Sequence, residues 1–356
     1  MLIFNLYFPL LKKQNHIIIF RLSAMGDVAM AIPVLRALIQ QNQNTTITFV
    51  SKPFLKPLFD NIDRVTFFAA DVNNKHKGFL GLFRLYKDLK KLNPTHFADI
   101  HNVLRSKLVR FFFSIFSKVS IATIDKGRSE KKALTRKKDK IFNQLKTSHQ
   151  RYADVFSELG FAIDLKKISA LEKEKLNSTN VLLTGEKKNT WIGIAPFAAF
   201  KSKTYPIDLL EKVIHALTKK GYHIFLFGGK EDIITLERIQ NTSSNTISVA
   251  GKLGGLKNEI NLISNLDLML SMDSGNAHFA AMQHIKTVTI WGNTHPYAGF
   301  APFNQPKSFQ ILPDLEKYPL LPCSIYGNKT FEGYEDVMES ITPKKIVETI
   351  VGIVEK

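Results

Sequence analysis

The sequence predicts an α/β protein with two domains, each built around a parallel sheet. Short apolar, β-rich runs alternate with helical apolar patterns along most of the 356 residues, which is typical of βαβ units. A chain of this length exceeds one ordinary hydrophobic core, so two domains are expected. Polar residues around 165–190 separate two such series. We therefore predict a first domain at residues 1–175 and a second domain at residues 176–356. The C-terminal end of the chain is a candidate to cross over and pack on the first domain.

In the first half, three apolar runs predict strands and two helical patterns predict helices. The strands are expected at residues 17–22, 46–51 and 97–100, and the helices at residues 28–40 and 103–116. Between residues 125 and 151, ten Lys or Arg accompany three acidic residues. We expect this segment to be a solvated loop, with contact to a polyanion as the second interpretation.

The second half repeats the alternation. Strands are expected at residues 191–195, 223–229, 246–251, 266–273 and 287–292, and helices at residues 207–219, at 256–264, from Glu231 and from Asn276. Several of these strands end in Gly, Asp or small residues where the next helix begins. Because ligands of open parallel sheets bind at the carboxyl ends of the strands, a site is expected at these junctions.

The composition is that of a soluble globular protein, with 44% hydrophobic and 22% charged residues. The one cysteine, Cys323, excludes an internal disulfide framework and a multi-thiolate zinc site and fits a reducing compartment, so we expect a cytoplasmic protein. The apolar opening, residues 1–14, is about half as long as a membrane span and lacks the features of a signal peptide. It is a short surface anchor, an element packed on the first domain, or an over-extended start.

The net charge of +18 is concentrated in the first half of the chain. Residues 1–175 contain 31 Lys and Arg against 14 Asp and Glu, whereas residues 176–356 contain 18 against 17. Such a one-sided field attracts anionic partners, whether nucleic acid, a phospholipid surface or a phosphorylated substrate.

The stretch LSAMGDV places Ser23, Gly26 and Asp27 between the first strand and the first helix. Gly26 allows a tight turn and a close approach to a ligand, and the first N–H groups of the helix carry partial positive charge. On these residues alone, Asp27 is either a helix N-cap or a functional carboxylate.

A second junction, MDSGNAH, is richer in polar side chains. Asp273 ends a strand, Ser274 and Gly275 form the turn, and Asn276 opens a helix that carries His278. Backbone N–H groups at such a helix start bind phosphate oxygens, and a histidine can add a further donor to a diphosphate. The alternative for the histidine is a structural, half-buried role.

A third element, the loop KSKTYP, carries Lys201 and Lys203 at the same edge of the sheet. A lysine suits a leaving phosphate, although surface lysines without a function are common. Three such elements at one edge predict an anion site.

These segments, together with FGGKED, LISNLDLMLSMDSGNAHFAAM and TVTIWGNTHP, resemble glycosyltransferase family 9, the ADP-heptose:lipopolysaccharide heptosyltransferases. They occur in order from residue 16 to residue 300. The resemblance implies a GT-B architecture, in which two Rossmann-like domains with parallel sheets face each other across a cleft. It also implies an inverting, peripheral membrane enzyme that moves a heptose or related sugar from an ADP-linked nucleotide sugar. The implied acceptor is the lipopolysaccharide core, or another acidic lipid-linked glycan, at the inner face of the cytoplasmic membrane.

The resemblance also assigns roles by position. Asp27 matches the catalytic base, in a cleft turn that includes Ser23 and Gly26. Lys203 matches a lysine that meets the donor phosphates, Glu231 lies near the ribose position, and Leu253 matches the base pocket. The implied donor-binding residues are Lys203, Glu231, Leu253, Asp273, Ser274, Gly275, Asn276 and His278. The implied acceptor-binding residues, in FADIHNVLRSK, are Asp99, His101, Asn102 and Arg105.

Elementary chemistry supports this division of roles. An inverting transfer needs one base to take the proton from the acceptor hydroxyl, while the leaving nucleoside diphosphate needs positive charge and N–H donors. Acidic sugars or phosphates of the acceptor would meet Arg105 and the basic residues Lys126, Arg128, Lys131 and Lys132. The sequence contains no Asp-x-Asp pair, and Mg²⁺ or Mn²⁺ sites need clustered carboxylates, so we expect no metal and no cofactor.

Two departures from the family pattern concern the donor. Ala198 and Ala199 stand where family members usually have hydroxyl residues ahead of the lysine that meets the phosphates. Either backbone N–H groups and Ser202 take over the role of the two missing hydroxyl groups, or the sugar donor differs. His295 stands where an acid is more usual. A relative that uses a different sugar nucleotide is therefore an alternative.

Other classes of protein have weaker support. No G-x-G-x-x-G follows the first strand of either half, which disfavours a dinucleotide-dependent dehydrogenase. A basic nucleic-acid-binding protein is the main alternative from another class. No zinc-finger spacing or RNP-like signature accompanies the aromatic residues, so nucleic acid is not an expected partner. The retained Asp27 and Lys203 disfavour an inactive relative.

Overall fold

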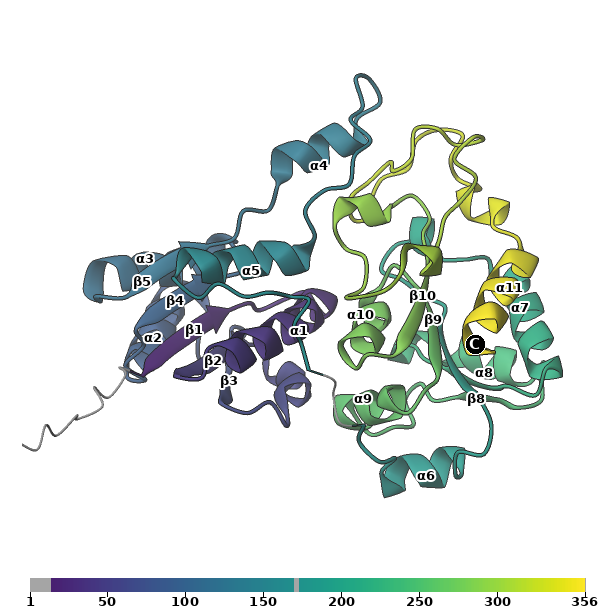
Figure 1. Ribbon diagram of the computed structural model, residues 1–356, viewed down its shortest axis with the longest axis horizontal. Coiled ribbons are helices and arrows are strands. Elements are labelled where there is room, and N and C mark those ends of the chain that lie inside the picture. The colour runs from purple at the N-terminus through teal and green to yellow at the C-terminus, as the bar shows by residue number, and fades with distance from the viewer. Residues whose placement is uncertain (1–13, 170–172, 356) are drawn as a thin grey trace, which may run out of the picture. The chain divides into compact units, whose positions relative to one another are not determined.

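Two parallel sheets organise the chain in a computed structural model that describes residues 14–169 and 173–355 (Figure 1). The three interpretations of the apolar opening concern residues that, except for Gln14, lie outside this description. Among the described residues, we find no helix with the length and apolar character needed to cross a bilayer.

The first sheet has the strand order β3-β2-β1-β4-β5, and all its pairs are parallel. Its strands are β1 (Asn15–Phe20), β2 (Thr45–Ser51), β3 (Val65–Ala69), β4 (His96–Asp99) and β5 (Ser120–Thr123). Its helices are α1 (Met25–Gln41), α2 (Gly78–Lys90) and α3 (Leu104–Phe116). The order reverses between β1 and β4, where Phe20 pairs with Asp99. Ligands of such folds bind outside this switch point.

The second sheet has the order β11-β10-β9-β6-β7-β8, again with all pairs parallel. Its strands are β6 (Trp191–Ala195), β7 (His223–Leu226), β8 (Thr246–Ser248), β9 (Leu268–Met272), β10 (Lys286–Ile290) and β11 (Gln310–Ile311). The helices of this part are α6 (Ser178–Thr184), α7 (Ile207–Lys219), α8 (Ile233–Gln240), α9 (Leu256–Ser264), α10 (Gly275–Met282) and α11 (Pro343–Val354). Here the order reverses between β6 and β9, so the carboxyl ends of these two strands flank the second switch point.

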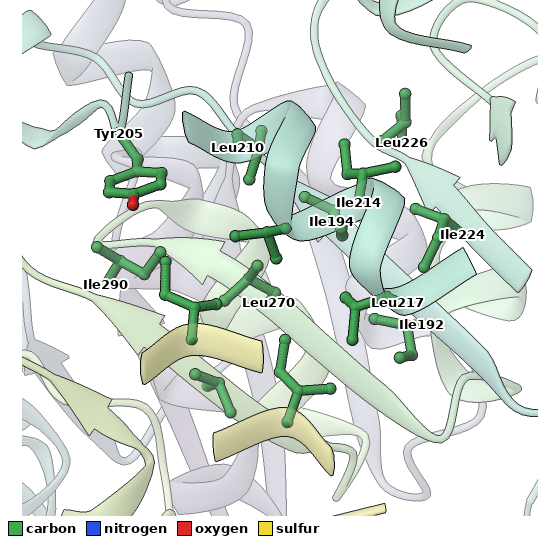
Figure 2. Close-up of a cluster of buried hydrophobic side chains, with 14 of the residues drawn as sticks. Ile192, Ile194, Tyr205, Leu210, Ile214, Leu217, Ile224, Leu226, Leu270 and Ile290 are labelled. Atoms are coloured by element: carbon green, nitrogen blue, oxygen red, sulfur yellow. The ribbon is translucent and has the colours of Figure 1, made fainter. Parts of the chain in front are cut away.

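A large hydrophobic core covers one face of the second sheet (Figure 2). Ile194 and Leu270 from adjacent strands pack beneath Leu210 and Ile214 of α7. The last helix, α11, joins the same core through Ile346, Ile350 and Ile353. The apolar stripe of α11 therefore completes this core, and packing of the chain end on the first domain stays a prediction.

The chain separates by contacts into two units that are not continuous in sequence. Among the described residues, unit 1 contains 14–22, 35–124 and 153–164, and unit 2 contains 23–34, 125–152, 165–169 and 173–355. The sequence pattern instead predicted one break, between residues 175 and 176. The start of α1 and the basic segment 125–152 thus make most of their contacts with the unit that holds the second sheet.

The basic segment 125–151 is not the solvated loop that its charge suggested. It contains α4 (Arg128–Thr135) and leads into α5 (Ser148–Glu158), and Leu134 is fully buried. Arg151 is buried, and its guanidinium lies 2.7 Å from a carboxylate oxygen of Glu130. Lys140 donates to the carbonyl oxygens of Leu320 and Pro322, each at 3.0 Å. The segment is therefore anchored through Leu134, Arg151 and Lys140, while most of its other cations stay exposed.

The expected linker at residues 165–190 is also partly structured. Asn177 caps α6 by accepting the N–H of Asn180 at 2.9 Å. The buried side-chain amide of Asn180 donates to the backbone of Asn258 and the side chain of Asn261, both on α9. These amide contacts attach α6 to unit 2.

Candidate active site

The N-terminal ends of α1 and α10 approach each other within unit 2. A Cβ atom added to Gly26 would lie 3.1 Å from Cδ2 of His278 and 3.2 Å from Cα of Gly275. Conversely, a Cβ on Gly275 would lie 3.7 Å from the backbone nitrogen of Gly26. Because both residues lack side chains, two helix ends with partial positive charge can lie close together.

Asp27 is the third residue of α1, so it is not the N-cap that the sequence allowed. Its Oδ2 atom accepts the N–H of Ala24 at 3.0 Å, which is the return bond of a capping box. Its backbone carbonyl accepts a hydrogen bond from the hydroxyl of Tyr152 at 3.3 Å. The carboxylate is only partly buried. It therefore stabilises the first turn and remains within reach of solvent.

Lys203 and Asp273 form a buried pair at the carboxyl end of β9. Nζ of Lys203 donates to the backbone oxygen of Asp273 at 2.7 Å and lies 3.3 Å from its Oδ2 atom. The same Oδ2 atom accepts the hydroxyl of Thr294 at 2.9 Å. Gly327 leaves room for the lysine stem, since a Cβ there would lie 2.6 Å from Cγ of Lys203. Two predicted donor-binding residues are thus brought together. They are supported by Thr294, to which its motif TVTIWGNTHP assigned no role, and by Gly327, which lies in no quoted motif.

His278 is buried beside this pair. Burial lowers its pKa because the cation loses hydration, and nearby Lys203 lowers it too, while Asp273 and Asp27 act in the opposite direction. The imidazole is therefore neutral at physiological pH. Within the described part of the chain, its buried Nδ1 atom has no hydrogen-bond partner. Such an atom costs free energy unless a ligand or water satisfies it.

The turn before α10 supplies further polar groups. Ser274 precedes the helix in an extended conformation, and its hydroxyl is 3.1 Å from that of Ser271. Neither it nor Asn276 is fully buried. The first N–H groups of α10 have no partner within the helix, as at any helix start. The turn can therefore donate to an anion with both backbone and side chains.

A separate hollow of about 460 Å³ lies at the carboxyl ends of β7 and β8. Leu253 lines it together with five glycines, at positions 228, 229, 251, 254 and 255. Glu231, in the short helix Lys230–Asp232, lies beside it: a Cβ on Gly229 would be 2.6 Å from a Glu231 carboxylate oxygen. Its size and its mixture of apolar wall and glycine backbone suit a nucleoside.

The same hollow contains a carboxyl group that the motifs missed. Glu259, in the first turns of α9, lines the hollow, and burial raises its pKa from 4.5 to about 7. The only sequence signal is its position four residues after Gly255, at a glycine-rich helix start. An acid titrating near neutrality in a hollow is a candidate functional group.

The predicted acceptor-side residues lie in unit 1, after β4. Asp99 is fully buried and accepts the N–H groups of His101 at 3.0 Å and Asn102 at 2.7 Å. Its other oxygen is 3.4 Å from the guanidinium of Arg110. Arg105 is exposed on the first turn of α3. Asp99 therefore shapes the turn, His101 is buried beside it, Asn102 donates to the carbonyl of Ile124, and Arg105 is the exposed group among them.

The two departures from the family pattern have a structural explanation. His295 is buried, its Nδ1 atom accepts the N–H of Tyr297, and it contacts the ring of Phe142 at 5.0 Å. Burial and Lys140 lower its pKa to about 4, so the imidazole is neutral at physiological pH. The hydroxyl of Ser202 donates to the carbonyl of Gly327. This hydroxyl is therefore engaged within the protein, and both a role for backbone N–H groups and a different donor stay predictions.

No group of three or more His, Cys, Asp or Glu side chains suited to a metal ion occurs within residues 14–169 and 173–355. The predicted independence from metal stays a prediction, to be tested by activity.

Comparisons with known proteins agree with the fold. The model of glycosyltransferase family 9 (heptosyltransferase) matches residues 82–320. The chain is 26% identical to lipooligosaccharide heptosyltransferase 2 of Haemophilus ducreyi over 374 residues, which cover 94% of this chain and 98% of the relative. It is 24% identical to the lipopolysaccharide core heptosyltransferase of Haemophilus influenzae, covering 82% and 83%.

Solved structures show the same architecture. A glycosyltransferase of family 9 from Veillonella parvula superposes with a TM-score of 0.74 at 16% identity, covering 96% of this chain and 98% of that one. The ADP-heptose lipopolysaccharide heptosyltransferase II of E. coli gives a TM-score of 0.70 at 18% identity, with the same coverages. The predicted α/β fold of GT-B type, with two parallel sheets, is confirmed.

Proposed function

Because the chain belongs to glycosyltransferase family 9 and is a glycosyltransferase, we propose that it transfers a heptose or related sugar by an inverting, metal-independent mechanism. The donor is a nucleotide diphosphate sugar, with ADP as the expected nucleotide. The acceptor is the lipopolysaccharide core or another acidic, lipid-linked glycan at the inner face of the cytoplasmic membrane. The names of the two Haemophilus relatives support the choice of sugar and acceptor.

The donor diphosphate is assigned to the start of α10. The N–H groups of the turn at Ser274 and Gly275 donate to phosphate oxygens, and the helix end adds partial positive charge. Lys203 supplies the full charge that stabilises the leaving nucleoside diphosphate. His278 is buried, neutral and unpartnered at Nδ1 among the described residues, so it can donate one hydrogen bond to the diphosphate without adding charge.

The nucleoside is assigned to the glycine-lined hollow. Leu253 packs against the base, and Glu231 accepts from the ribose hydroxyls. The hollow and the start of α10 both lie at carboxyl ends of strands of the same sheet, as expected for one extended ligand.

Asp27 is assigned as the general base. It takes the proton from the acceptor hydroxyl as that oxygen attacks the anomeric carbon, and the bond from the anomeric carbon to the diphosphate breaks with inversion. The observation that carries this proposal is the contact of Gly26 with Gly275 and His278, because it holds the Asp27 turn beside the proposed diphosphate site. His101, Asn102 and Arg105 are assigned to the acceptor.

Metal independence follows from the same groups. A divalent ion would neutralise the leaving diphosphate, and here Lys203, the start of α10 and the start of α1 supply positive potential instead. Transfer is expected to continue in excess EDTA, and loss of transfer that Mg²⁺ or Mn²⁺ restores would contradict this assignment.

Substitution of Asp27 tests the mechanism. Asp27→Asn should lower the rate of nucleoside diphosphate release by about 10²- to 10⁴-fold, the usual contribution of a general base, while donor affinity changes little. Asp208→Asn is the matched control, because Asp208 is an exposed acid in the first turn of α7. Both variants lose an acid that favours a helix start, so only a difference in turnover reports on chemistry. Equal, small effects of the two substitutions would reduce Asp27 to a capping residue.

A ligand screen tests the donor. Thermal unfolding with ADP, other nucleoside diphosphates and their sugar conjugates should show the largest stabilisation for the true donor, about 2.7 kcal/mol at a hundred times its Kd. If uridine or guanosine nucleotides stabilise the protein and ADP does not, the proposed glycosyltransferase activity would stand and the proposed donor nucleotide would be wrong.

A further inference from the structure

The outer surface of α2 and α3 in unit 1 exposes an unusual number of large apolar side chains. Six of them are between 51% and 77% exposed: Phe79, Leu80, Leu104, Phe111, Ile115 and Phe116. The inner sides of both helices are buried in the core of unit 1. A monomeric globular protein rarely leaves this much apolar surface to water without a partner.

The two helices pack against each other, and we call their combined outer surface the α2–α3 face (Figure 1). The exposed ring of Phe79 contacts Phe112 of α3 at 5.5 Å. Near the other end, Lys90 of α2 donates to the backbone oxygen of Phe116 at 2.7 Å. Both ends of α2 thus contact the last turns of α3, so the exposed side chains of α2 and of the end of α3 belong to one surface.

Cations are interspersed among the apolar side chains of this face. Residues 77–118 contain nine Lys and Arg against two Asp. One aspartate, Asp99, is fully buried, and the other, Asp88, lies 2.7 Å from the ammonium of Lys75. Neither leaves its negative charge unpaired on the surface. The face therefore combines apolar contact with positive charge.

Two hollows on this face pair cations with apolar walls. One, of about 400 Å³, is lined by Lys107, Arg110 and Phe111 among others. The second, of about 470 Å³, is lined by Lys90, Lys118 and Phe116 among others. A phosphate beside an acyl or glycerol group has the chemistry that such a lining accepts.

We propose that the α2–α3 face docks on the surface of a bilayer that contains anionic phospholipids. Its apolar side chains enter the boundary between headgroups and acyl chains, and its cations contact the phosphates. A second copy of the chain fits less well, because a two-fold contact through this face would place its cations against the same cations of the partner. The proposal deepens the proposed function, whose acceptor is lipid-linked, by naming the surface that would bring the enzyme to it.

Vesicle binding by the full chain, measured without donor or acceptor, tests the proposal separately from catalysis. Wild-type protein should sediment with vesicles of phosphatidylcholine and phosphatidylglycerol and much less with phosphatidylcholine alone. Replacing Lys77, Lys107 and Lys118 by Gln should weaken binding by about fivefold per lysine, or about a hundredfold in total. Phe111→Ser with Ile115→Ser should also weaken binding, and more of that loss should persist at high salt.

Matched controls are available in unit 2. Lys212, Lys219 and Lys307 are exposed and can be replaced by Gln, and the exposed Leu182 and Ile234 can be replaced by Ser. These variants should bind vesicles like wild type. Circular dichroism and retained ADP binding establish that every variant is folded.

Three results would overturn the proposal. The first is equal vesicle binding by the α2–α3 variants and their controls, and the second is binding that ignores the anionic lipid. The third is a concentration-dependent dimer that Phe111→Ser with Ile115→Ser dissociates, which would assign the face to self-association. If nucleotide sugar turnover failed while vesicle binding followed the expected pattern, the proposed function would be wrong and the docking face would stand.

Discussion

Glu259 makes nucleoside binding depend on pH. Its carboxyl group lines the hollow assigned to the nucleoside, and its pKa is raised to about 7 by burial. A nucleoside that fills the hollow removes more water from this group, so the neutral form is the one that tolerates the ligand. Binding is therefore expected to take up a proton and to strengthen as the pH falls.

The magnitude follows from the fraction of neutral carboxyl. With a pKa of about 7, this fraction is about nine tenths at pH 6 and about one tenth at pH 8. If only the neutral form binds, the apparent affinity changes by about tenfold between the two pH values. Adenosine is the ligand to use in calorimetry, because it has no phosphate that titrates in this range.

Two variants separate Glu259 from its neighbour in the same hollow. Glu259→Gln cannot titrate, so its affinity for adenosine should not change between pH 6 and pH 8. Glu231→Gln should weaken binding through the ribose but keep the tenfold change. An affinity of the wild-type protein that is flat with pH, or a slope that survives in Glu259→Gln, would refute the reasoning.

Three further predictions follow from single contacts. Gly26→Ala brings a methyl group within 3.2 Å of the backbone of Gly275 and should reduce turnover, which enzyme kinetics would measure. Gly352→Ala places its methyl group where no atom lies within 4 Å, so it should stabilise α11 by about 0.5–1 kcal/mol in thermal unfolding. Burial lowers the pKa of His149 from 6.5 to about 3, so the unfolded chain binds more protons than the folded chain between these pH values. The free energy of unfolding should therefore fall as the pH drops from 6.5 to about 3, by up to about 1.4 kcal/mol per pH unit. Urea unfolding across this range tests the prediction, and His149→Gln should lack that share of the slope. Tyr205→Phe removes a 2.6 Å hydrogen bond from the hydroxyl to the buried carbonyl of Ile341. It should lower the free energy of unfolding by about 1–3 kcal/mol in the same urea assay, and a change near zero would contradict this hydrogen bond.

The fold was predictable where apolar periodicity is strong. β1, β6 and β9 are continuous apolar runs followed by small residues, and each was expected within a few residues of its observed bounds. The pattern did not predict β3, α2 or β5. β3 is only partly buried, so its alternation is weak, and the exposed Phe79 and Leu80 of α2 obscure its apolar stripe.

The sequence predicted those parts of the candidate site whose residues lie within short, recognisable motifs. The Lys203 and Asp273 pair and the buried His278 were expected at one sheet edge and lie together there. Thr294 and Glu259 were not expected, because their roles arise from contacts between segments distant in sequence or from burial in a hollow. For the same reason the sequence could not show that Ser202 is already bonded to Gly327.

The division of the chain into units has a consequence for protein engineering. The polypeptide passes from one unit to the other five times, and the segment with Asp27 belongs by contact to the unit that holds the donor-binding residues. A chimaera of two relatives joined at residue 175 would therefore pair the Asp27 turn and segment 125–152 of one parent with foreign surroundings. Exchange of sugar-nucleotide specificity would have to transplant three stretches together, and a gene fragment encoding the second half alone would yield an incomplete folding unit.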